Sequence, residues 1–169
     1  MANDFRSARF WAREMILPAL HSGSRAIDAT MGNGGDTLAL CELVGETGRV
    51  YAFDVQEAAI ESTRARLQSA GMLDRATLIH AGHERISEFI SEPADAIVFN
   101  LGWLPGAQHG ITTRVETTLS AVDQALEALA PDGVMTVCIY PGHEEGARER
   151  DALIDWAKRV NPRRFDVLI

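Results

Sequence analysis

The fold of this chain follows from one stretch, Ala26-Ile27-Asp28-Ala29-Thr30-Met31-Gly32-Asn33-Gly34-Gly35-Asp36. Its apolar start predicts a buried strand, its glycines predict a tight turn, and Asp36 stands where a helix would begin. A strand, a glycine turn and a helix in this order form the nucleotide-cofactor cradle of doubly wound α/β proteins. The alternative is an ordinary strand-to-helix connection in which Asp36 caps the helix.

The charges around the turn bear on which cofactor it would hold. A dinucleotide fingerprint is G-x-G-x-x-G, and Thr37 stands where its third glycine should be. Asp28 and Asp36 flank the turn, whereas a pyrophosphate needs backbone N–H groups and no nearby negative charge. S-adenosylmethionine brings an ammonium that suits an aspartate and a carboxylate that suits loop N–H groups. The acidic turn therefore favours S-adenosylmethionine over NAD.

A third acidic residue supports a nucleoside site. Arg49-Val50-Tyr51-Ala52-Phe53-Asp54 predicts a strand that ends in an acid. An acid about 20 residues after the glycine turn accepts hydrogen bonds from ribose hydroxyls. Both dinucleotide and S-adenosylmethionine sites use such an acid, so Asp54 does not choose between them.

Strands and helices alternate along the chain, which predicts an α/β fold with a parallel sheet and right-handed crossovers. Helices are expected at Ser7–Leu20, Asp36–Leu43, Glu57–Ala70, Glu84–Ile90, Thr113–Ala130 and Glu144–Val160. Strands are expected at Arg25–Thr30, Arg49–Val55, Ala76–Ala81, Ala96–Leu101, Val134–Tyr140 and Phe165–Ile169. This is the Rossmann-like, doubly wound sheet of the class I S-adenosylmethionine-dependent methyltransferases, without their final antiparallel strand. We expect either a truncated chain or another segment or subunit to cover that edge.

Length and composition are those of one globular domain. The chain has 169 residues, of which 46% are hydrophobic, and we expect a single domain over 1–169 with an N-terminal helical extension at 1–22. It has no apolar run of the roughly 20 residues that span a bilayer, and its N-terminus has no signal-peptide pattern. Cys41 and Cys138 are expected to be small core residues. We therefore expect a cytoplasmic protein.

The net charge of −8 bears on partners. A protein that holds nucleic acid over its whole surface is usually basic, so this one would need a local basic patch. The candidates are Arg6, Arg9, Arg13, Arg148 and Arg150. The alternative for these arginines is a solvated helix face.

Two loops after predicted strands carry groups that could hold a flat substrate. The strand over Ala96–Leu101 runs into Asn100-Leu101-Gly102-Trp103-Leu104-Pro105-Gly106. Asn100 could hold an acceptor amine with its lone pair aimed at the sulfonium methyl group, or it could cap the turn. Trp103 could stack on a base, or it could pack in the core or at a dimer interface. A homodimer stays a candidate assembly.

The next strand ends in Tyr140-Pro141-Gly142-His143. His143 could act as a base or a phosphate contact, or it could cap a helix. Tyr140 could contact substrate, although packing at the strand end is the simpler interpretation. His83 could stack on the cofactor's adenine, or it could simply begin a helix. The histidines show no metal-ligand spacing, so no metal is expected.

Five segments together resemble one family of small bacterial methylases. They are Asp28–Gly34, Phe53–Gln56, Ala81–Glu84, Phe99–Gly106 and Tyr140–His143. The family was long labelled "putative rRNA methylases", and its members are understood as methyltransferases of the tRNA wobble uridine. The resemblance implies methylation of the amine of 5-aminomethyluridine at position 34, often on the 2-thiolated base. It also implies an anticodon stem-loop as partner.

The resemblance and the local patterns together nominate a site. Asn100 would orient the amine, and His143 is the candidate base. The candidate cofactor contacts are Asp28, Met31, Gly32, Asn33, Gly34, Asp36, Asp54, Gln56, His83 and Asn100. The candidate substrate contacts are Trp103, Tyr140 and His143. The chain departs from the family at Gly35, where a histidine is usual, and at its C-terminus, beyond which the family continues.

Other functions remain open at this point. The chain could methylate rRNA, a small molecule or a protein. It could be an NAD-linked oxidoreductase, which the acidic turn and the missing third glycine disfavour. It could also bind S-adenosylmethionine without catalysis, which the loop at Asn100 disfavours.

Overall fold

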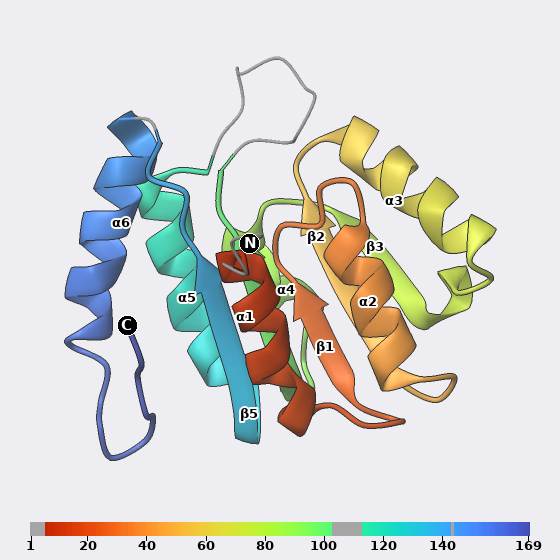
Figure 1. The fold of residues 1–169 in the computed structure, drawn as a ribbon, viewed down its shortest axis with the longest axis horizontal. Coiled ribbons are helices and arrows are strands. Elements are labelled where there is room, and N and C mark those ends of the chain that lie inside the picture. The colour runs from red at the N-terminus through yellow and green to blue at the C-terminus, as the bar shows by residue number, and fades with distance from the viewer. Residues whose placement is uncertain (1–5, 103–112, 143) are drawn as a thin grey trace, which may run out of the picture.

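The computed structural model describes residues 6–102, 113–142 and 144–169. Its helices are α1 (Ala8–Ile16), α2 (Gly35–Val44), α3 (Glu57–Ser69), α4 (Ile86–Phe89), α5 (Val115–Ala128) and α6 (Glu144–Ala157). Its strands are β1 (Arg25–Asp28), β2 (Arg49–Asp54), β3 (Ala76–His80), β4 (Ala94–Asn100) and β5 (Leu129–Cys138) (Figure 1). Short 3₁₀ helices follow at Leu17–Ala19, Leu73–Arg75 and His83–Arg85.

Within the described ranges the strands form one sheet in the order β3-β2-β1-β4-β5. Every pairing is parallel, and Ile27 of β1 lies between Tyr51 of β2 and Ile97 of β4. The strand order reverses beside β1, and ligands of open α/β sheets bind at the carboxyl ends of the strands at such a point. The predicted Rossmann-like class is confirmed.

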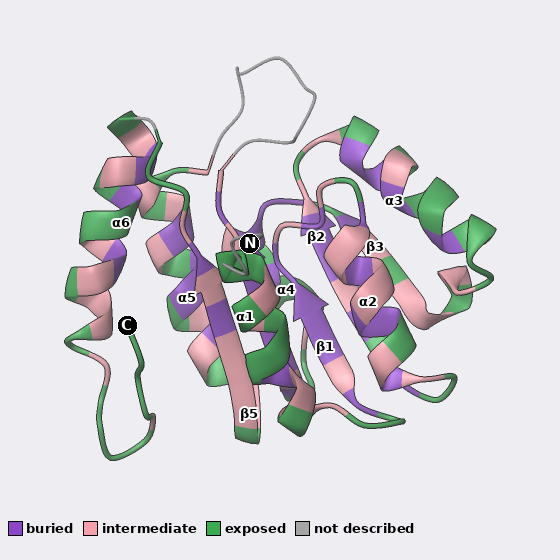
Figure 2. Ribbon diagram, in the orientation of Figure 1, coloured by how far each residue is buried: buried purple, intermediate pink, exposed green. Residues whose placement is uncertain are grey.

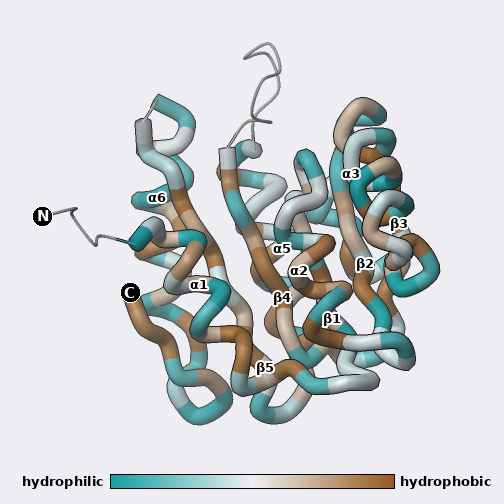
Figure 3. The backbone as a smooth tube through the Cα atoms, turned by 45° about the vertical axis from the view of Figure 1, so that its right-hand side comes forward, coloured by the Kyte–Doolittle hydropathy of each residue, from teal (hydrophilic) through white to brown (hydrophobic). Residues whose placement is uncertain are grey.

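Helices cover both faces of the sheet. On one face α1, α2 and α3 bury Ile16, Leu40 and Leu67 against the strands. On the other face α4, α5 and α6 bury Ile86, Val122 and Leu153. Figure 1 shows α1 and α2 in front of the sheet and α5 behind it. The inner strands β1 and β4 are buried over most of their length, whereas the edge strands β3 and β5 are less buried (Figure 2). The buried stretches of the strands are largely hydrophobic (Figure 3).

Helix α1 begins where its sequence predicts and packs beside the end strand of the sheet. The hydroxyl of Ser7 accepts a hydrogen bond from the backbone N–H of Phe10 at 3.2 Å, which caps the helix. Ile16 is buried, while Trp11 and Met15 are exposed. Because α1 lies against β5 and β4, its first turn reaches the carboxyl ends of the strands.

Strand β5 differs from its prediction in its bounds. Ala94 pairs with Leu129 and Ala96 pairs with Val134, so the residues between them bulge out of the ladder. Asp132 has φ +63° in this bulge. Residues Pro131 to Gly133 therefore lie inside the strand, which begins at Leu129 rather than at Val134 and ends at Cys138 rather than at Tyr140.

The strand predicted at Phe165–Ile169 is wrong, because these residues form no strand. After α6 the chain turns, and the backbone N–H groups of Arg164 and Phe165 both donate to the carbonyl of Asn161. Leu168 and Ile169 are 82% and 77% exposed, so their apolar side chains pack against no sheet. An apolar sequence becomes a strand only where a partner strand receives it.

No helix in the described ranges has the length and apolar character that crossing a membrane requires.

Candidate functional site

The glycine turn connects β1 to α2 beneath the site. Gly32 and Gly34 have φ +50° and +74°, a left-handed backbone that other residues rarely adopt. The N–H of Met31 donates to the carbonyl of Phe53, and the N–H of Gly34 donates to the carbonyl of Met31. These bonds hold the turn over the end of β2.

Helix α3 packs directly on this turn. A Cβ at Gly34 would lie 2.7 Å from the hydroxyl of Thr63 and 2.9 Å from its Cα. The Thr63 hydroxyl donates to the carbonyl of Gly32 at 3.0 Å. Gly34 is therefore a packing residue, and the structure does not bring it to the cavity wall.

Asp28 lies under the turn rather than in the site. It is completely buried, accepts the hydroxyl of Thr37 at 2.7 Å and accepts the N–H of Thr30 at 3.2 Å. Burial raises the pKa of its carboxyl from 3.8 to about 7. Asp28 does not line the cavity, so its nomination as a cofactor contact is not supported, and its hydrogen bonds assign it to holding the turn.

A cavity of about 990 Å³ opens at the carboxyl ends of the strands. Nine of the nominated residues line it: Met31, Gly32, Asn33, Asp36, Asp54, Gln56, His83, Asn100 and Tyr140. They come from the ends of β1, β2, β3, β4 and β5 and from the start of α2. Trp103 and His143 lie outside the described residues. The arrangement places carboxylates, an amide and an imidazole around one opening.

Asp54 is preorganised at the end of β2. Its Oδ2 accepts the N–H of Gly32 at 3.1 Å, and its Oδ1 accepts the N–H of Gln56 at 3.0 Å. A carboxylate offers about four lone-pair positions, so each oxygen retains capacity toward the cavity. Asp54 can therefore accept further hydrogen bonds from a ligand that carries hydroxyl groups.

The centre of the site is a contact between Asn100 and Asp36. The Nδ2 of Asn100 donates to the Oδ2 of Asp36 at 2.7 Å, and the Oδ1 of Asp36 accepts the Nε of Arg9 at 2.7 Å. The backbone of Asn100 is also fixed, because its N–H donates to the hydroxyl of Thr30 at 2.7 Å. The Oδ1 of Asn100 is buried and has no hydrogen-bond partner among the described residues.

His83 follows β3 and Tyr140 follows β5, the strands at the two edges of the sheet. His83 is buried, its ring meets Phe99 edge to face, and its Nδ1 lies 3.3 Å from the carbonyl of Ala29. Burial lowers the pKa of His83. Its Nδ1 is the donor in the contact with Ala29, because a carbonyl oxygen only accepts hydrogen bonds. Tyr140 is 46% exposed, and desolvation raises the pKa of its phenol.

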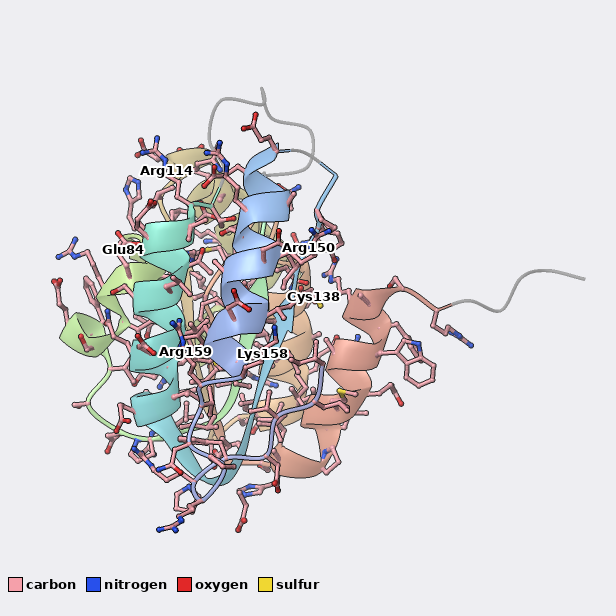
Figure 4. All side chains as sticks on the ribbon, turned by 90° about the vertical axis from the view of Figure 1, so that its left-hand side faces the viewer. Glu84, Arg114, Cys138, Arg150, Lys158 and Arg159 are labelled. Carbon is pink, nitrogen blue, oxygen red and sulfur yellow. The ribbon has the colours of Figure 1, made fainter. Side chains whose placement is uncertain are left out.

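The sequence interpretation missed several lining residues. Arg66 of α3 donates its Nε to the carbonyl of Asn33 at 2.7 Å, and Arg114 precedes α5. Figure 4 shows Arg114 at the upper end of α5, while Lys158 and Arg159 lie towards the opposite end of α6. Arg114 is the second residue of the helix predicted at Thr113–Ala130, which follows the carboxyl end of a predicted strand. This position could have identified Arg114 as a candidate site residue.

Buried Glu149 of α6 was also missed. Its two oxygens accept the hydroxyls of Thr113 at 2.7 Å and Thr118 at 2.5 Å. Thr113 lines the cavity, and its hydroxyl accepts the N–H of Gly102 at 3.1 Å. Through Thr113, Glu149 therefore connects the start of α5 to Gly102, just after the end of β4. The sequence gives no sign of this role, because acidic residues on a helix are usually exposed.

The arginines nominated for a basic patch have varied surroundings. Arg148 pairs with Glu144 at 2.7 Å, and Arg150 pairs with Asp151 at 2.8 Å. The guanidinium of Arg6 lies over the ring of Phe10, and Arg13 is exposed. Exposed ion pairs contribute about 0–1 kcal/mol, so a phosphate could compete for Arg148 and Arg150.

Comparisons with known proteins give a consistent set of relatives. A family model described as "Putative rRNA methylase" matches residues 50–169. A "putative rRNA-methylase" from Clostridium thermocellum superposes with a TM-score of 0.92 at 38% identity, over 95% of this chain and 87% of that one. A "putative methyltransferase" from Streptococcus mutans, solved in complex with SAH, superposes with a TM-score of 0.88 at 36% identity, over 97% and 88%.

A curated relative carries a specific activity in its name. The chloroplastic tRNA (mnm(5)s(2)U34)-methyltransferase of Arabidopsis thaliana is 39% identical over 144 residues. The match covers 79% of this chain and 53% of that protein. This chain thus spans about half the length of that relative.

Proposed function

The chain belongs to the family described as putative rRNA methylases, and from this membership and the cavity we propose that it is an S-adenosylmethionine-dependent methyltransferase. The observation that carries the proposal is the buried Oδ1 of Asn100, which has no hydrogen-bond partner among the described residues and belongs to a residue that lines a cavity built on a glycine turn. A buried acceptor without a partner costs about 1–3 kcal/mol. We expect such an atom at a strand end where a bound ligand supplies the missing hydrogen-bond donor.

The donor set of the cavity fits S-adenosylmethionine. Helix α2 begins at the glycine turn with no side-chain cap, so its first N–H groups suit the cofactor's carboxylate. The carboxylate of Asp36 suits its ammonium, and the spare lone pairs of Asp54 suit its ribose hydroxyls. The solved relative in complex with SAH supports the same choice.

When bound, the cofactor supplies an electrophilic methyl group on sulfur, and the chain's residues orient the acceptor. Asn100 would accept a hydrogen bond from an amine N–H through Oδ1. An amine attacks only when it is unprotonated, and a partly desolvated cavity disfavours the ammonium form. Because a neutral amine already carries a free lone pair, no carboxylate needs to remove a proton from it before the attack.

We infer that the acceptor is the 5-aminomethyl group of the wobble uridine in tRNA. The support is the relative named for this activity at 39% identity and the resemblance of the loops that follow β4 and β5. An rRNA acceptor is the second candidate, because the family description itself names rRNA. The proposal makes the anticodon stem-loop the partner, with His143 and Trp103 as candidate contacts outside the described residues.

The test is a methylation assay with defined RNAs. The enzyme is incubated with S-adenosylmethionine and anticodon stem-loops that carry 5-aminomethyluridine or unmodified uridine, and with rRNA fragments. Nucleoside mass spectrometry then identifies the product. We expect 5-methylaminomethyluridine from the first substrate alone. Methylation of rRNA fragments without any change in tRNA would exclude the wobble acceptor and leave the methyltransferase activity standing.

A further inference from the structure

Three side chains from distant parts of the chain form a hydrogen-bonded row along one wall of the cavity. Arg9 comes from α1, Asp36 from the first turn of α2 and Asn100 from the end of β4. Arg9 donates to one oxygen of Asp36, and Asn100 donates to the other, both at 2.7 Å. All three side chains line the cavity.

The row determines which atom of the Asn100 amide is bound to Asp36 and which atom remains available to a ligand. A carboxylate only accepts hydrogen bonds, so the amide NH₂ of Asn100 must face Asp36. Rotating the amide by half a turn would place its oxygen against the carboxylate and would break a charge-assisted bond. The Oδ1 of Asn100 is therefore the atom left without a hydrogen-bond partner in the part of the chain that the structure describes.

Arg9 holds Asp36 in this orientation. A free aspartate in the first turn of a helix can rotate to accept that helix's own unsatisfied N–H groups. The hydrogen bond from the Nε of Arg9 to the Oδ1 of Asp36 opposes such a rotation. Without Arg9, Asp36 could turn toward α2 and release Asn100.

The guanidinium of Arg9 lies close to Gly35. Its Nη2 is 2.6 Å from the position that a Cβ at Gly35 would take, so a side chain at residue 35 would require the guanidinium to shift. The side chains of Arg9 and Asp36 are 51% and 23% exposed. A pair this exposed contributes little to the free energy of folding, so stability does not explain the arrangement.

We propose that Arg9 and Asp36 are positioning residues, which fix the amide of Asn100 so that Oδ1 accepts a hydrogen bond from the attacking amine. This inference rests on the proposed function. It gives Asp36 a role beyond any contact with the cofactor's ammonium. It also assigns Arg9, on the N-terminal helix, to the acceptor side of the site.

The first test is a double-mutant cycle on kcat, with both substrates saturating. We expect Arg9→Gln to lower kcat about tenfold and Asn100→Ala to lower it about 100-fold, because misplacement of a reacting group has effects of this size. The double variant should be no slower than Asn100→Ala, because Arg9 acts through Asn100. Arg9→Lys should recover part of the loss. Multiplicative losses would overturn the proposal.

A matched control is available in Arg85. Its side chain is 48% exposed, its Nε donates to Glu88 at 3.0 Å, and it does not line the cavity. Arg85→Gln removes the same kind of ion pair and should leave kcat unchanged. A loss of kcat in Arg85→Gln equal to that in Arg9→Gln would attribute the effect to surface charge and would overturn the proposal.

The second test does not depend on activity. The side-chain NH₂ signal of Asn100 is assigned in a ¹⁵N-resolved NMR spectrum by its absence in Asn100→Ala. We expect Arg9→Gln to shift this signal and Arg85→Gln to leave it in place. An unchanged Asn100 signal in Arg9→Gln would overturn the row. A shifted signal in a protein that transfers no methyl group would refute the proposed function and leave the row intact.

Discussion

Replacing Gly34 with alanine tests whether the glycine turn is held by the packing of α3. At φ +74° an alanine meets the left-handed penalty of about 1–2 kcal/mol. Its Cβ would also lie 2.7–2.9 Å from three atoms of Thr63, one of which is the backbone Cα. Overpacking of this kind costs about a further 1–3 kcal/mol, so we expect Gly34→Ala to lower the free energy of unfolding by about 2–5 kcal/mol.

Gly71 provides the matched control. Its φ is +68°, and a Cβ there would have no atom within 4 Å. Gly71→Ala therefore carries the backbone penalty alone, about 1–2 kcal/mol. The difference in the free energy of unfolding between the two variants therefore measures the contact between α3 and the turn, because both variants carry the same backbone penalty.

Urea unfolding of both variants measures this difference in the free energy of unfolding. Calorimetric titration with S-adenosylhomocysteine measures the effect of each substitution on ligand binding. We expect Gly34→Ala to weaken binding and Gly71→Ala to leave it unchanged. Adding Thr63→Ala to Gly34→Ala removes two of the three contact atoms and should recover part of the stability. Unfolding free energies of the two glycine variants within about 0.5 kcal/mol of each other would refute the packing argument.

Three further predictions concern carboxylates. Asp54→Ala should weaken S-adenosylhomocysteine binding by about 1–3 kcal/mol, measured by titration calorimetry, because hydrogen bonds to a charged group are lost. Asp28 binds its proton more tightly when folded, since its pKa is raised to about 7. Wild-type stability relative to Asp28→Asn should therefore fall as pH rises from about 4 to about 7 and then level off, and a constant difference in melting temperature would contradict this. Glu149→Ala should cost about 1–3 kcal/mol in urea unfolding, because the hydroxyl protons of Thr113 and Thr118 lose their acceptor, and adding Thr118→Val should recover part of that loss.

The parts of the fold that sequence predicted well depend on local pattern. The glycine turn, the acid at the end of β2 and the alternation of strands and helices all lie within short windows. The sixth strand failed because Phe165–Ile169 has the composition of a strand but no partner strand beside it. The start of β5 was misplaced because a bulge at Asp132 lets the strand begin at Leu129, ahead of the predicted start at Val134.

The parts of the site that sequence did not predict depend on contacts between distant residues. Asp28 and Asp36 look equivalent around the turn, yet one is fully buried under it and the other faces the cavity. The bond from Arg9 to Asp36 joins residues that are 27 positions apart, and the bond from Thr118 to Glu149 joins residues 31 apart. No periodicity in the sequence indicates such pairs, because they depend on how α1 and α6 pack against the rest of the folded protein.

The net negative charge of the chain is compatible with its proposed RNA partner if some arginines can exchange their carboxylate partners for phosphate groups. Arg148 and Arg150 pair with acids on their own helix, and exposed pairs of this kind are worth at most about 1 kcal/mol. A phosphate can therefore replace the carboxylate at little cost. Arg9 differs, because its partner Asp36 is also bound by Asn100, and moving Arg9 to a phosphate would disturb the acceptor site. The arginine nominated for RNA binding that lies nearest the cavity is thus the one least free to bind RNA.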